Sequence, residues 1–500
     1  MIMAEKSIVI IGAGIAGLST GCYGQMNGYG TQIFELHDKP GGLCTSWKRK
    51  GYTFDGCIHW LVGSGSGTAF HRVWEELGAL QGRRIVDHEE FFRIEGTDGK
   101  TLIIYTDVDQ LEQHIKELSP TDADVIKEFT DAVRFFSRSE MPLDKPRELY
   151  GPLDGLKMMF RMRRFMKPFM KWKKTSIEEF ASRFSDPFLR EVFPLIIDIN
   201  DFPMVALLFT LAVMHKRDAG YPIGGSLAFA RAIERRYLDL GGEIHYKSRV
   251  EKILVENDHA IGVRLTDGTE HRADMVVSAA DGHATIFNML EGKYVNDKIR
   301  GYYDELPIFQ PVIQVSLGVD RDLSGEPHTI IYTFEKPVTI AGEEREWLNV
   351  KHYCFDPTLT PQGKSAVTVL INSNYDYWKP LLEDRGRYES EKQQIAAEVI
   401  NQLDKRFPGL KEQVEVVDVA TPMTYERYTG NWQGSFEGWL ITTKTFGMSM
   451  SKTLPGLKSF YMVGQWVEPG GGLPPAALSG RNVIQIICKR DRKQFVAQIP

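Results

Sequence analysis

Three glycines near the N-terminus have the spacing of a phosphate-binding turn: Gly12, Gly14 and Gly17 form a G-x-G-x-x-G pattern. In such a turn the first glycine permits a tight bend, the second lets the backbone approach a pyrophosphate, and the third allows close packing of helix and strand. Glu35 follows 18 residues after Gly17, where a carboxylate can accept hydrogen bonds from a ribose with a free 2′-hydroxyl. The pattern favours FAD or NAD over NADP. The alternative is a structural turn that binds no nucleotide.

The elements around these glycines must be a strand, a turn, a helix and a second strand. Residues 7–11 are a continuous apolar, β-branched run, which predicts a parallel strand buried on both faces. A helix of small residues follows and ends near Gly28, and residues 31–35 form the next strand. The N-terminus of that helix would then face the phosphates of a bound nucleotide.

Glycines gather at two further points, after the second strand and near the C-terminus. Gly41 and Gly42 come shortly after Glu35, and a strand over 460–464 leads to Gly464, a glycine-rich turn at 469–472 and a helix. Such turns aim backbone N–H groups at a phosphate or at an electron-rich ring edge. Closing one site with both ends of the chain suits a long ligand and favours FAD over NAD.

Composition places the chain among ordinary globular proteins. Its 500 residues correspond to roughly three domains, and 42% are hydrophobic and 25% charged, which excludes disorder, collagen and a disulfide scaffold. The net charge of −6 argues against a nucleic-acid binder driven by overall charge. Five cysteines without a C-x-x-C pair indicate reduced thiols and no metal site.

No membrane span or signal peptide is expected. The longest apolar run, 202–214, has 13 residues, fewer than the roughly 20 that cross a bilayer. The first apolar stretch leads directly into glycines without a cleavage-type site. The expected location is therefore cytoplasmic.

The order of the remaining elements predicts an α/β fold with a discontinuous, Rossmann-like FAD-binding domain. We expect that domain to comprise residues 1–85, 220–290 and 455–500. A β-sheet substrate domain would comprise 86–110 and 291–454, with strands over 312–319 and 366–372 and a helix over 390–407. Residues 111–219 are mostly helical in pattern and would form a cap that faces a membrane.

Several motifs occur in the order found in a known group of flavoproteins. They are the N-terminal glycines with Glu35 and Gly41-Gly42, Phe54-Asp55-x-x-x-His59, Tyr221-Pro-x-Gly224-Gly225, and Val463-Gly464 followed by Pro469-Gly-Gly-Gly472-x-Pro474. Together they resemble the phytoene desaturase-like flavoproteins, including carotenoid isomerases and retinol saturase, within the amine oxidase-type FAD superfamily.

The resemblance implies a set of cofactor-binding positions. Non-covalent FAD would be held by Gly12, Gly14, Ile15, Ala16, Gly17, Glu35, Gly41, Gly42, Val250, Gly464, Gln465, Gly472, Leu473 and Pro474. Many relatives have an acid that holds the ribityl chain at the position of Gln465. No cysteine lies near 434–438 for covalent attachment of the flavin.

Four residues next to the expected flavin or substrate segments are candidate active-site groups. They are His59, Tyr428, Trp432 and Glu468, of which His59 and Glu468 are the catalytic candidates. For each of them the alternative is a role in packing or in supporting the site.

A second glycine run, Gly63-Ser-Gly65-Ser-Gly67 with Asp87 downstream, offers another dinucleotide fingerprint. Its spacing is G-x-G-x-G and its preceding segment contains a polar histidine, so the alternative is a loop near the flavin.

Residues Lys157 to Lys174 form a basic, aromatic-rich segment with eight Lys or Arg and no acid in 18 residues. Such a segment is typical of docking on a membrane surface. A solvated helix with one packed face and a site for a protein partner are the alternatives, and no nucleic-acid motif accompanies the segment.

The expected activity is redox or isomerisation chemistry on a long unsaturated hydrocarbon, such as an isoprenoid or polyene. Two other substrate groups remain open: an amine or porphyrinogen, and an unsaturated fatty acid that is isomerised or hydrated. A fatty acid favours an Arg or Lys at the mouth of the substrate tunnel, whereas a carotene needs none. A flavin-bearing lipid-binding protein without turnover is the alternative from another class. The sequence leaves the oligomeric state open.

Overall fold

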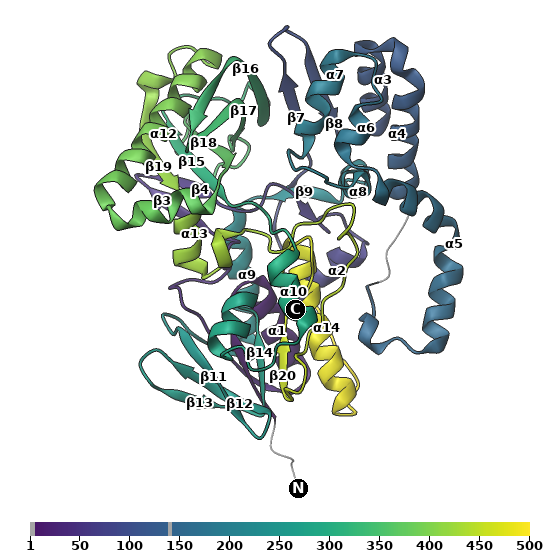
Figure 1. Cartoon of the computed structure of the whole chain (residues 1–500), viewed down its shortest axis with the longest axis vertical. Helices are drawn as coiled ribbons and strands as arrows, with labels where there is room; N and C mark the ends of the chain where they lie inside the picture. Colours follow the sequence, from purple (N-terminus) through teal and green to yellow (C-terminus); the bar gives the residue numbers. More distant parts are fainter. Residues whose placement is uncertain (1–5, 139–142) are drawn as a thin grey trace.

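A computed structural model describes residues 6–138 and 143–500 of the chain. A parallel sheet, a larger mixed sheet and a group of helices form three regions around the centre of the molecule (Figure 1). The α/β fold class predicted from the sequence is confirmed.

The parallel sheet has five strands in the order β10-β2-β1-β14-β20. Every adjacent pair is parallel, and β1 and β14 are almost fully buried, as their apolar sequences predict. The strands are β1 (Ser7–Ile11), β2 (Gly30–Phe34), β10 (Glu243–His245), β14 (Met275–Ser278) and β20 (Phe460–Met462).

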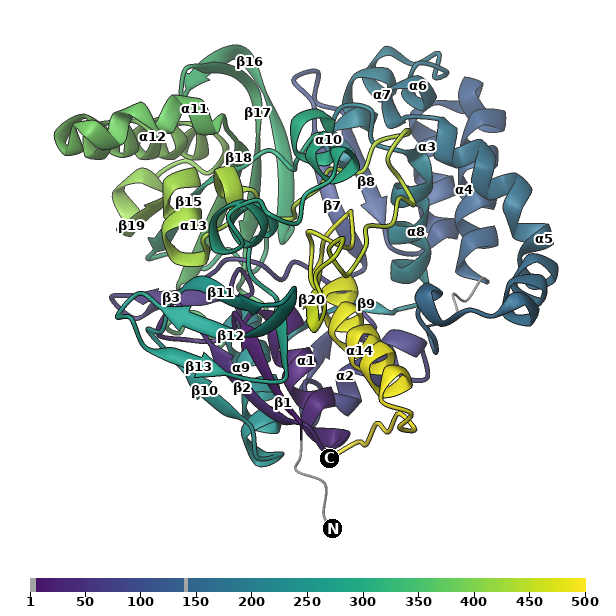
Figure 2. The ribbon, with the colours of Figure 1, turned by 60° about the horizontal axis from the view of Figure 1, so that its bottom comes forward.

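Three helices pack with this sheet and bring the two chain ends together (Figure 2). They are α1 (Ile15–Met26), α9 (Gly225–Asp239) and α14 (Leu473–Arg490). A Cβ added to Gly480 of α14 would lie 2.7 Å from the backbone nitrogen of Thr20 in α1. The glycine therefore permits the close approach of helices that lie more than 400 residues apart in the sequence. An antiparallel sheet of β11 (Val250–Glu256), β12 (His259–Leu265) and β13 (Glu270–Arg272) borders this region.

The larger sheet has seven strands in the order β19-β15-β18-β17-β16-β7-β8. The predicted strands over 312–319 and 366–372 are β15 (Val312–Val319) and β18 (Ser365–Asn372). The hairpin of β7 (Glu90–Glu95) and β8 (Thr101–Tyr105) joins the sheet through parallel pairing of β7 with β16. The sequence analysis did not predict the long hairpin of β16 (Thr329–Ile340) and β17 (Glu343–His352). Strand β19 (Val414–Ala420) and helix α12 (Arg385–Arg406) complete this region.

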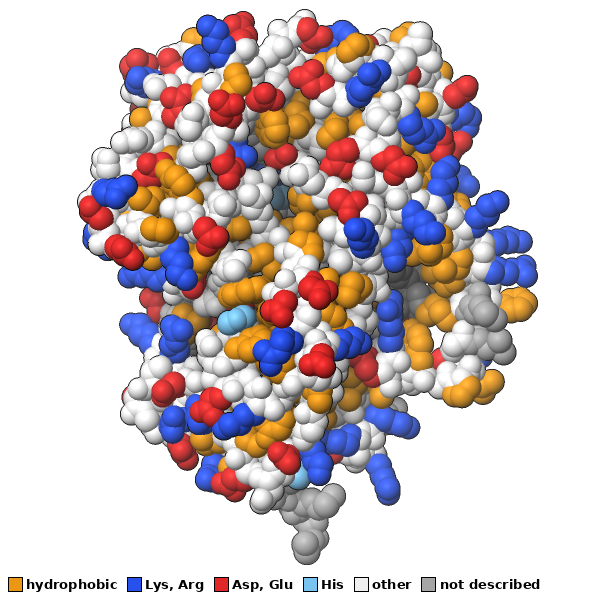
Figure 3. All heavy atoms as spheres, in the orientation of Figure 1, with side chains coloured by type: hydrophobic (Ala, Val, Ile, Leu, Met, Phe, Trp, Pro, Cys, Tyr) orange, Lys and Arg blue, Asp and Glu red, His pale blue; other side chains and the backbone are white. Residues whose placement is uncertain are grey.

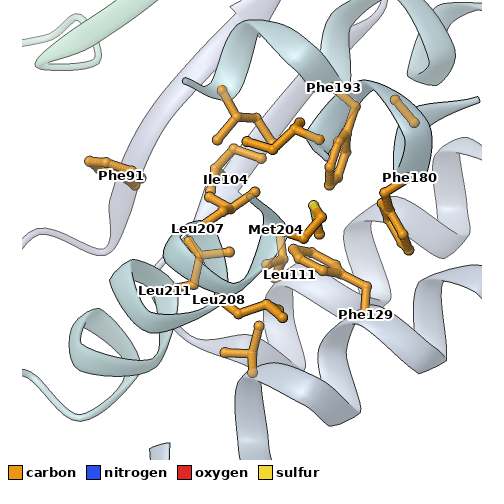
Figure 4. Close-up of a cluster of buried hydrophobic side chains, with 14 of the residues drawn as sticks. Phe91, Ile104, Leu111, Phe129, Phe180, Phe193, Met204, Leu207, Leu208 and Leu211 are labelled. Carbon is orange, nitrogen blue, oxygen red and sulfur yellow. The ribbon is translucent and has the colours of Figure 1, made fainter. Parts of the chain in front are cut away.

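The helical region contains α3 (Val108–Leu118), α4 (Ala123–Ser137), α5 (Pro152–Lys174), α6 (Ile177–Ala181), α7 (Pro187–Val192) and α8 (Met204–His215). The apolar run at 202–214 forms most of α8, whose side chains Leu207, Leu208 and Leu211 pack into a core with Phe129 and Phe193 (Figure 4). No described helix is long and apolar enough to cross a membrane. We keep the predicted domain boundaries at 85, 110, 219, 290 and 454 as a proposal.

Candidate functional site

A cavity of about 1240 Å³ lies where the parallel sheet, the seven-stranded sheet and the helical region meet. Ligand pockets for a single small molecule usually measure about 300–1,000 Å³. The cavity therefore has room for a cofactor and for part of a second molecule.

The N-terminal glycine turn forms one end of this cavity. Gly12 has a φ of +95°, and a Cβ on Gly17 would lie 1.9 Å from the Gly12 carbonyl oxygen, so both positions require glycine for structural reasons. A Cβ on Gly14 would meet no protein atom within 4 Å and would enter open space. Gly42 faces Gly14 across that space, because its own Cβ would lie 3.4 Å from the Gly14 Cα. This cradle at the N-terminus of α1 fits a pyrophosphate.

Glu35 lies at the end of β2 with its carboxylate at the cavity wall. Its oxygens accept hydrogen bonds from the backbone N–H groups of Ala13, at 2.6 Å, and of His37, at 2.8 Å. Burial raises the pKa of this carboxyl group, and the backbone donors oppose that rise. The bonds fix the carboxylate in the place where the adenosine ribose is expected.

The C-terminal turn closes the same cavity from the other side of the parallel sheet. The N–H of Gly464 donates to the Ser479 hydroxyl at 2.8 Å, which ties the end of β20 to α14. Gly470, Gly471 and Gly472 all have positive φ and lead into the N-terminus of α14 at the cavity wall.

Most of the predicted cofactor positions line this cavity between the α1 turn and the α14 turn. Gly17 is the exception, since it lies behind the turn. The cavity-lining positions are Gly12, Gly14, Ile15, Ala16, Glu35, Gly41, Gly42, Val250, Gly464, Gln465, Gly472, Leu473 and Pro474.

Two motifs that carried the family resemblance contact each other below the cavity. The Asp55 carboxylate accepts hydrogen bonds from the N–H and hydroxyl of Ser226, which follows Gly224-Gly225, and from the N–H of Cys57. A Cβ on Gly225 would lie 2.3 Å from this carboxylate. The contact fixes the segment that carries His59 against the start of α9.

The four candidate active-site residues have different surroundings. His59 lines the cavity, and its buried Nδ1 has no hydrogen-bond partner among the described residues. Glu468 is not among the described residues that line the cavity and forms an ion pair with Lys452 at 2.8 Å. Tyr428 is largely exposed, and Trp432 stacks on His283 with ring centroids 4.9 Å apart. Of the two catalytic candidates, His59 lines the cavity and Glu468 does not, and both catalytic roles stay predictions.

The sequence analysis missed two acidic residues at the cavity. Glu437 precedes Gly438, and its Cβ would lie 2.6 Å from a Cβ on Gly471, which places it beside the C-terminal turn. Burial raises the pKa of Glu437 to about 7, and its carboxyl group has no hydrogen bond to a described residue. Asp281 follows β14 and accepts hydrogen bonds from the N–H groups of Ala284 and Trp432, while burial raises its pKa to about 7. Neither acid is part of a motif with characteristic residue spacing, so the sequence of this protein alone gives no sign that either lies at the cavity.

A polar strand face was also missed. Side chains of β17 alternate between the two faces of the sheet. Leu348 and Val350 point into the hydrophobic core, and the odd-numbered residues from 345 to 351 that line the cavity point the other way. The cavity-facing residues are Arg345, Trp347, Asn349 and Lys351. The alternation of Leu348 and Val350 with polar residues is the sequence signal that could have located this strand.

The second glycine run is not a dinucleotide turn. The N–H of Gly65 donates to the Asp218 carboxylate at 2.9 Å, and Gly63 packs closely against Phe70 and Trp74. The strand before it, β5 (Leu61–Val62), is short and pairs in antiparallel fashion with β9 (Ala219–Pro222). A nucleotide fingerprint needs a parallel strand at this point.

The basic segment forms most of helix α5, which projects from the helical region (Figure 1). Lys and Arg side chains extend along that edge of the molecule (Figure 3). Phe160 is 66% exposed, whereas Phe165 and Trp172 are buried in the helical core. The segment itself contains no acid, but Lys171 forms an ion pair with Glu128 of α4. Part of its positive charge is therefore neutralised by a neighbouring helix.

Comparison with known proteins places these features in a family. A family model described as flavin containing amine oxidoreductase matches residues 15–488. The chloroplastic prolycopene isomerase of Daucus carota is 23% identical over 508 residues, which cover 95% of this chain and 79% of that protein. The lycopene-forming phytoene desaturase of Pseudescherichia vulneris is 26% identical over 509 residues, which cover 95% of this chain and 98% of that protein.

Among solved structures, an oxidoreductase from Methanosarcina mazei superposes with a TM-score of 0.59 at 18% identity, covering 96% of this chain and 100% of that one. Putrescine oxidase bound to putrescine gives a TM-score of 0.61 at 12% identity, covering 97% and 99%. At these identities the likeness shows the fold alone.

Proposed function

The chain belongs to the family of flavin-containing amine oxidoreductases, and we propose that it binds FAD non-covalently and acts on a long unsaturated apolar molecule. The observation that carries this proposal is that one continuous cavity is lined both by the pyrophosphate cradle and by apolar side chains of the helical region. These apolar side chains are Leu195, Ile196, Ile199 and Phe202. Relatives named for phytoene and prolycopene support a polyene substrate.

The chain would position the cofactor and supply the proton chemistry. A bound FAD would accept a hydride from a carbon of the substrate or return one to it. Glu437 is the group to which we assign the proton that leaves or joins the substrate, because its carboxyl group borders the C-terminal turn and changes charge near pH 7. His59 is the second candidate for this role.

The purified protein tests this proposal directly. Acid precipitation should release FAD into the supernatant in a 1:1 ratio to protein. Under anaerobic conditions, phytoene or prolycopene should either bleach the flavin absorbance or yield an isomer that chromatography detects. A protein that takes up no added FAD would contradict the cofactor assignment, and a flavoprotein that leaves both compounds unchanged would contradict the polyene substrate.

We also propose that the protein is cytoplasmic and docks peripherally on anionic membranes through α5. The exposed apolar residues Leu153, Phe160, Met166 and Met170 lie on the same helix as the exposed cations Arg163, Arg164 and Lys167. A basic residue near an anionic surface contributes about 1 kcal/mol of binding. Phe165 and Trp172 of the same segment are buried in the helical core, so they hold the helix to the protein and do not face lipid.

Vesicle co-sedimentation can separate docking from a solvated helix. Changing Arg163, Arg164 and Lys167 to Glu should weaken binding to phosphatidylserine vesicles at least tenfold without changing FAD content. The matched control changes the exposed residues Arg385, Arg387 and Lys405 of α12 to Glu, on the far side of the molecule (Figure 1). Equal losses in both variants would show a general charge effect and contradict docking through α5.

A further inference from the structure

Lys351 is a basic residue inside the cavity whose ammonium group has no hydrogen bond or ion pair with any described residue. It lies on β17 and faces the cavity, surrounded by the sheet and by the segment that carries His59. The burial that lowers its pKa to about 7 is opposed only by the charge of Asp55. The oxygens of Asp55 are occupied by Ser226 and Cys57. A buried amine of this kind is costly unless a ligand pairs with it.

The strands on both sides of Lys351 add hydroxyl groups to the same face of the sheet. Lys351 is directly opposite Thr329 of β16 and Thr368 of β18, and directly opposed residues share a face. Thr368 is 2% exposed, lines the cavity and has a buried hydroxyl oxygen without a hydrogen-bond partner. The hydroxyl of Thr329 is bonded to the ring of His328 at 2.8 Å.

Histidine rings from two other segments surround this point. His59 and His328 are both close enough to Lys351 for its charge to lower their pKa values. The Nδ1 of His59 and the Nε2 of His88 are buried without partners, and the His88 ring lies 3.8 Å from that of His328. At neutral pH these rings are uncharged and can each donate one N–H bond.

The opposite end of the β17 polar face differs in one respect. Arg345 is paired with Glu343 and donates to the Asn372 carbonyl at 2.6 Å, so most of its charge is already compensated within the protein. Roughly 20 Å of extended strand separates Arg345 from Lys351. The Nε of Arg345 is buried without a hydrogen-bond partner, but Arg345 has an ion pair and Lys351 has none among the described residues. The cation without a charged partner therefore lies at the Lys351 end of the cavity.

We propose that Lys351, Thr368 and His59 form a subsite for the carboxylate of an unsaturated lipid, so that the cavity binds an acid with an apolar chain more tightly than the corresponding ester or hydrocarbon. The proposal rests on the proposed function, because it names the substrate class of the same cavity. An ammonium donor, an unpaired hydroxyl and an unpaired imidazole can together satisfy the lone pairs of a carboxylate in an apolar surrounding. A carotene would leave these three groups unpaired.

A fluorescent polyene acid can test the subsite on the protein as purified. Titration with cis-parinaric acid and with its methyl ester should show at least tenfold tighter binding of the acid. Lys351→Met should remove that preference while the ester binds within about twofold of wild type, and Lys351→Arg should restore part of it. The matched control is Lys336→Met, which removes an exposed charge from β16 of the same sheet and should change neither affinity. Retinoic acid and methyl retinoate, tested in the same way, distinguish an isoprenoid chain from a linear one.

The possible outcomes separate this inference from the proposed function. Equal affinity for acid and ester in the wild type, or an acid preference that survives in Lys351→Met, would overturn the subsite. Flavin absorbance is recorded in each sample, because a protein without FAD would overturn the cofactor assignment and leave the acid preference measurable. An acid preference together with normal FAD content supports both.

Discussion

The two walls of the central cavity recognise their ligands by different means. The wall beside the parallel sheet presents backbone, because Gly12, Gly14 and Gly42 leave a cradle into which a side chain would project. The wall formed by β17 presents long side chains, among them Asn349 and Lys351. Backbone recognition suits a cofactor that every member of the family shares, whereas side chains can differ from one substrate to another. The first wall therefore indicates the cofactor and the second the substrate.

The largest effect is expected at the cofactor wall. Gly14→Val should abolish FAD binding, because the added side chain would occupy the space of the pyrophosphate. The protein should still fold, since no protein atom lies within 4 Å of the new Cβ. Flavin absorbance and circular dichroism measure the two outcomes separately. The matched control is Gly30→Val on β2, where an added Cβ also meets open space but outside the cavity lining. FAD retained in Gly14→Val would show that the cradle holds something else.

The difference between the cofactor wall and the substrate wall also explains which parts of the cavity could be predicted from the sequence. The strand, turn and helix over residues 7–26 are confirmed because local signals specify them: a buried apolar run, fixed glycine spacing and small helix residues. The strand β20 was predicted in the same way, within the strand expected over 460–464. Whether these residues bind the cofactor in the predicted manner stays a proposal.

The substrate wall could not be predicted because distant segments assemble it. The hairpin of β16 and β17 contains polar residues such as Asn349 and Lys351. From the sequence alone, such residues are expected to face solvent. Segments distant in the sequence, among them 57–62 and 195–202, line the same cavity as that face and so enclose it within the molecule. Glu437 likewise reaches the cavity through a segment without regular structure. In Glu468 the sequence offered a plausible acid that instead neutralises Lys452.

A smaller effect is expected where the two walls meet. Glu437→Gln should retain FAD and lower turnover by about 10²- to 10⁴-fold, the usual contribution of a general acid or base. Burial raises the pKa of Glu437 to about 7, so the group is protonated below that pH and ionised above it. If the carboxyl group donates a proton, turnover in the wild type should fall above pH 7, and Glu437→Asp should keep a titration that Glu437→Gln loses. A pH profile identical in wild type and Glu437→Gln would contradict the assignment.

The smallest of these effects concerns stability at the substrate wall and does not depend on any ligand. Burial lowers the pKa of Lys351 from 10.5 to about 7, so between these pH values the unfolded chain binds a proton that the folded chain does not. The free energy of unfolding contributed by this residue therefore rises with pH across that window and is lowest below pH 7. Lys351 is partly buried, and removing its unpaired amine should raise stability, so we expect Lys351→Met to gain about 1–3 kcal/mol at pH 7.

Urea unfolding of Lys351→Met and wild type at pH 7 and pH 10 measures this gain. The gain should shrink toward pH 10, because the free-energy cost of removing the proton from the amine on folding falls as the pH approaches the unfolded pKa of 10.5. The exposed Lys336→Met should show no gain at either pH. A gain in stability for Lys351→Met would show that Lys351 does not stabilise the fold, which is expected of a residue that binds a ligand. If Lys351→Met proves less stable than wild type at pH 7, the lysine has a structural partner, and the backbone-against-side-chain contrast between the two walls loses its main support.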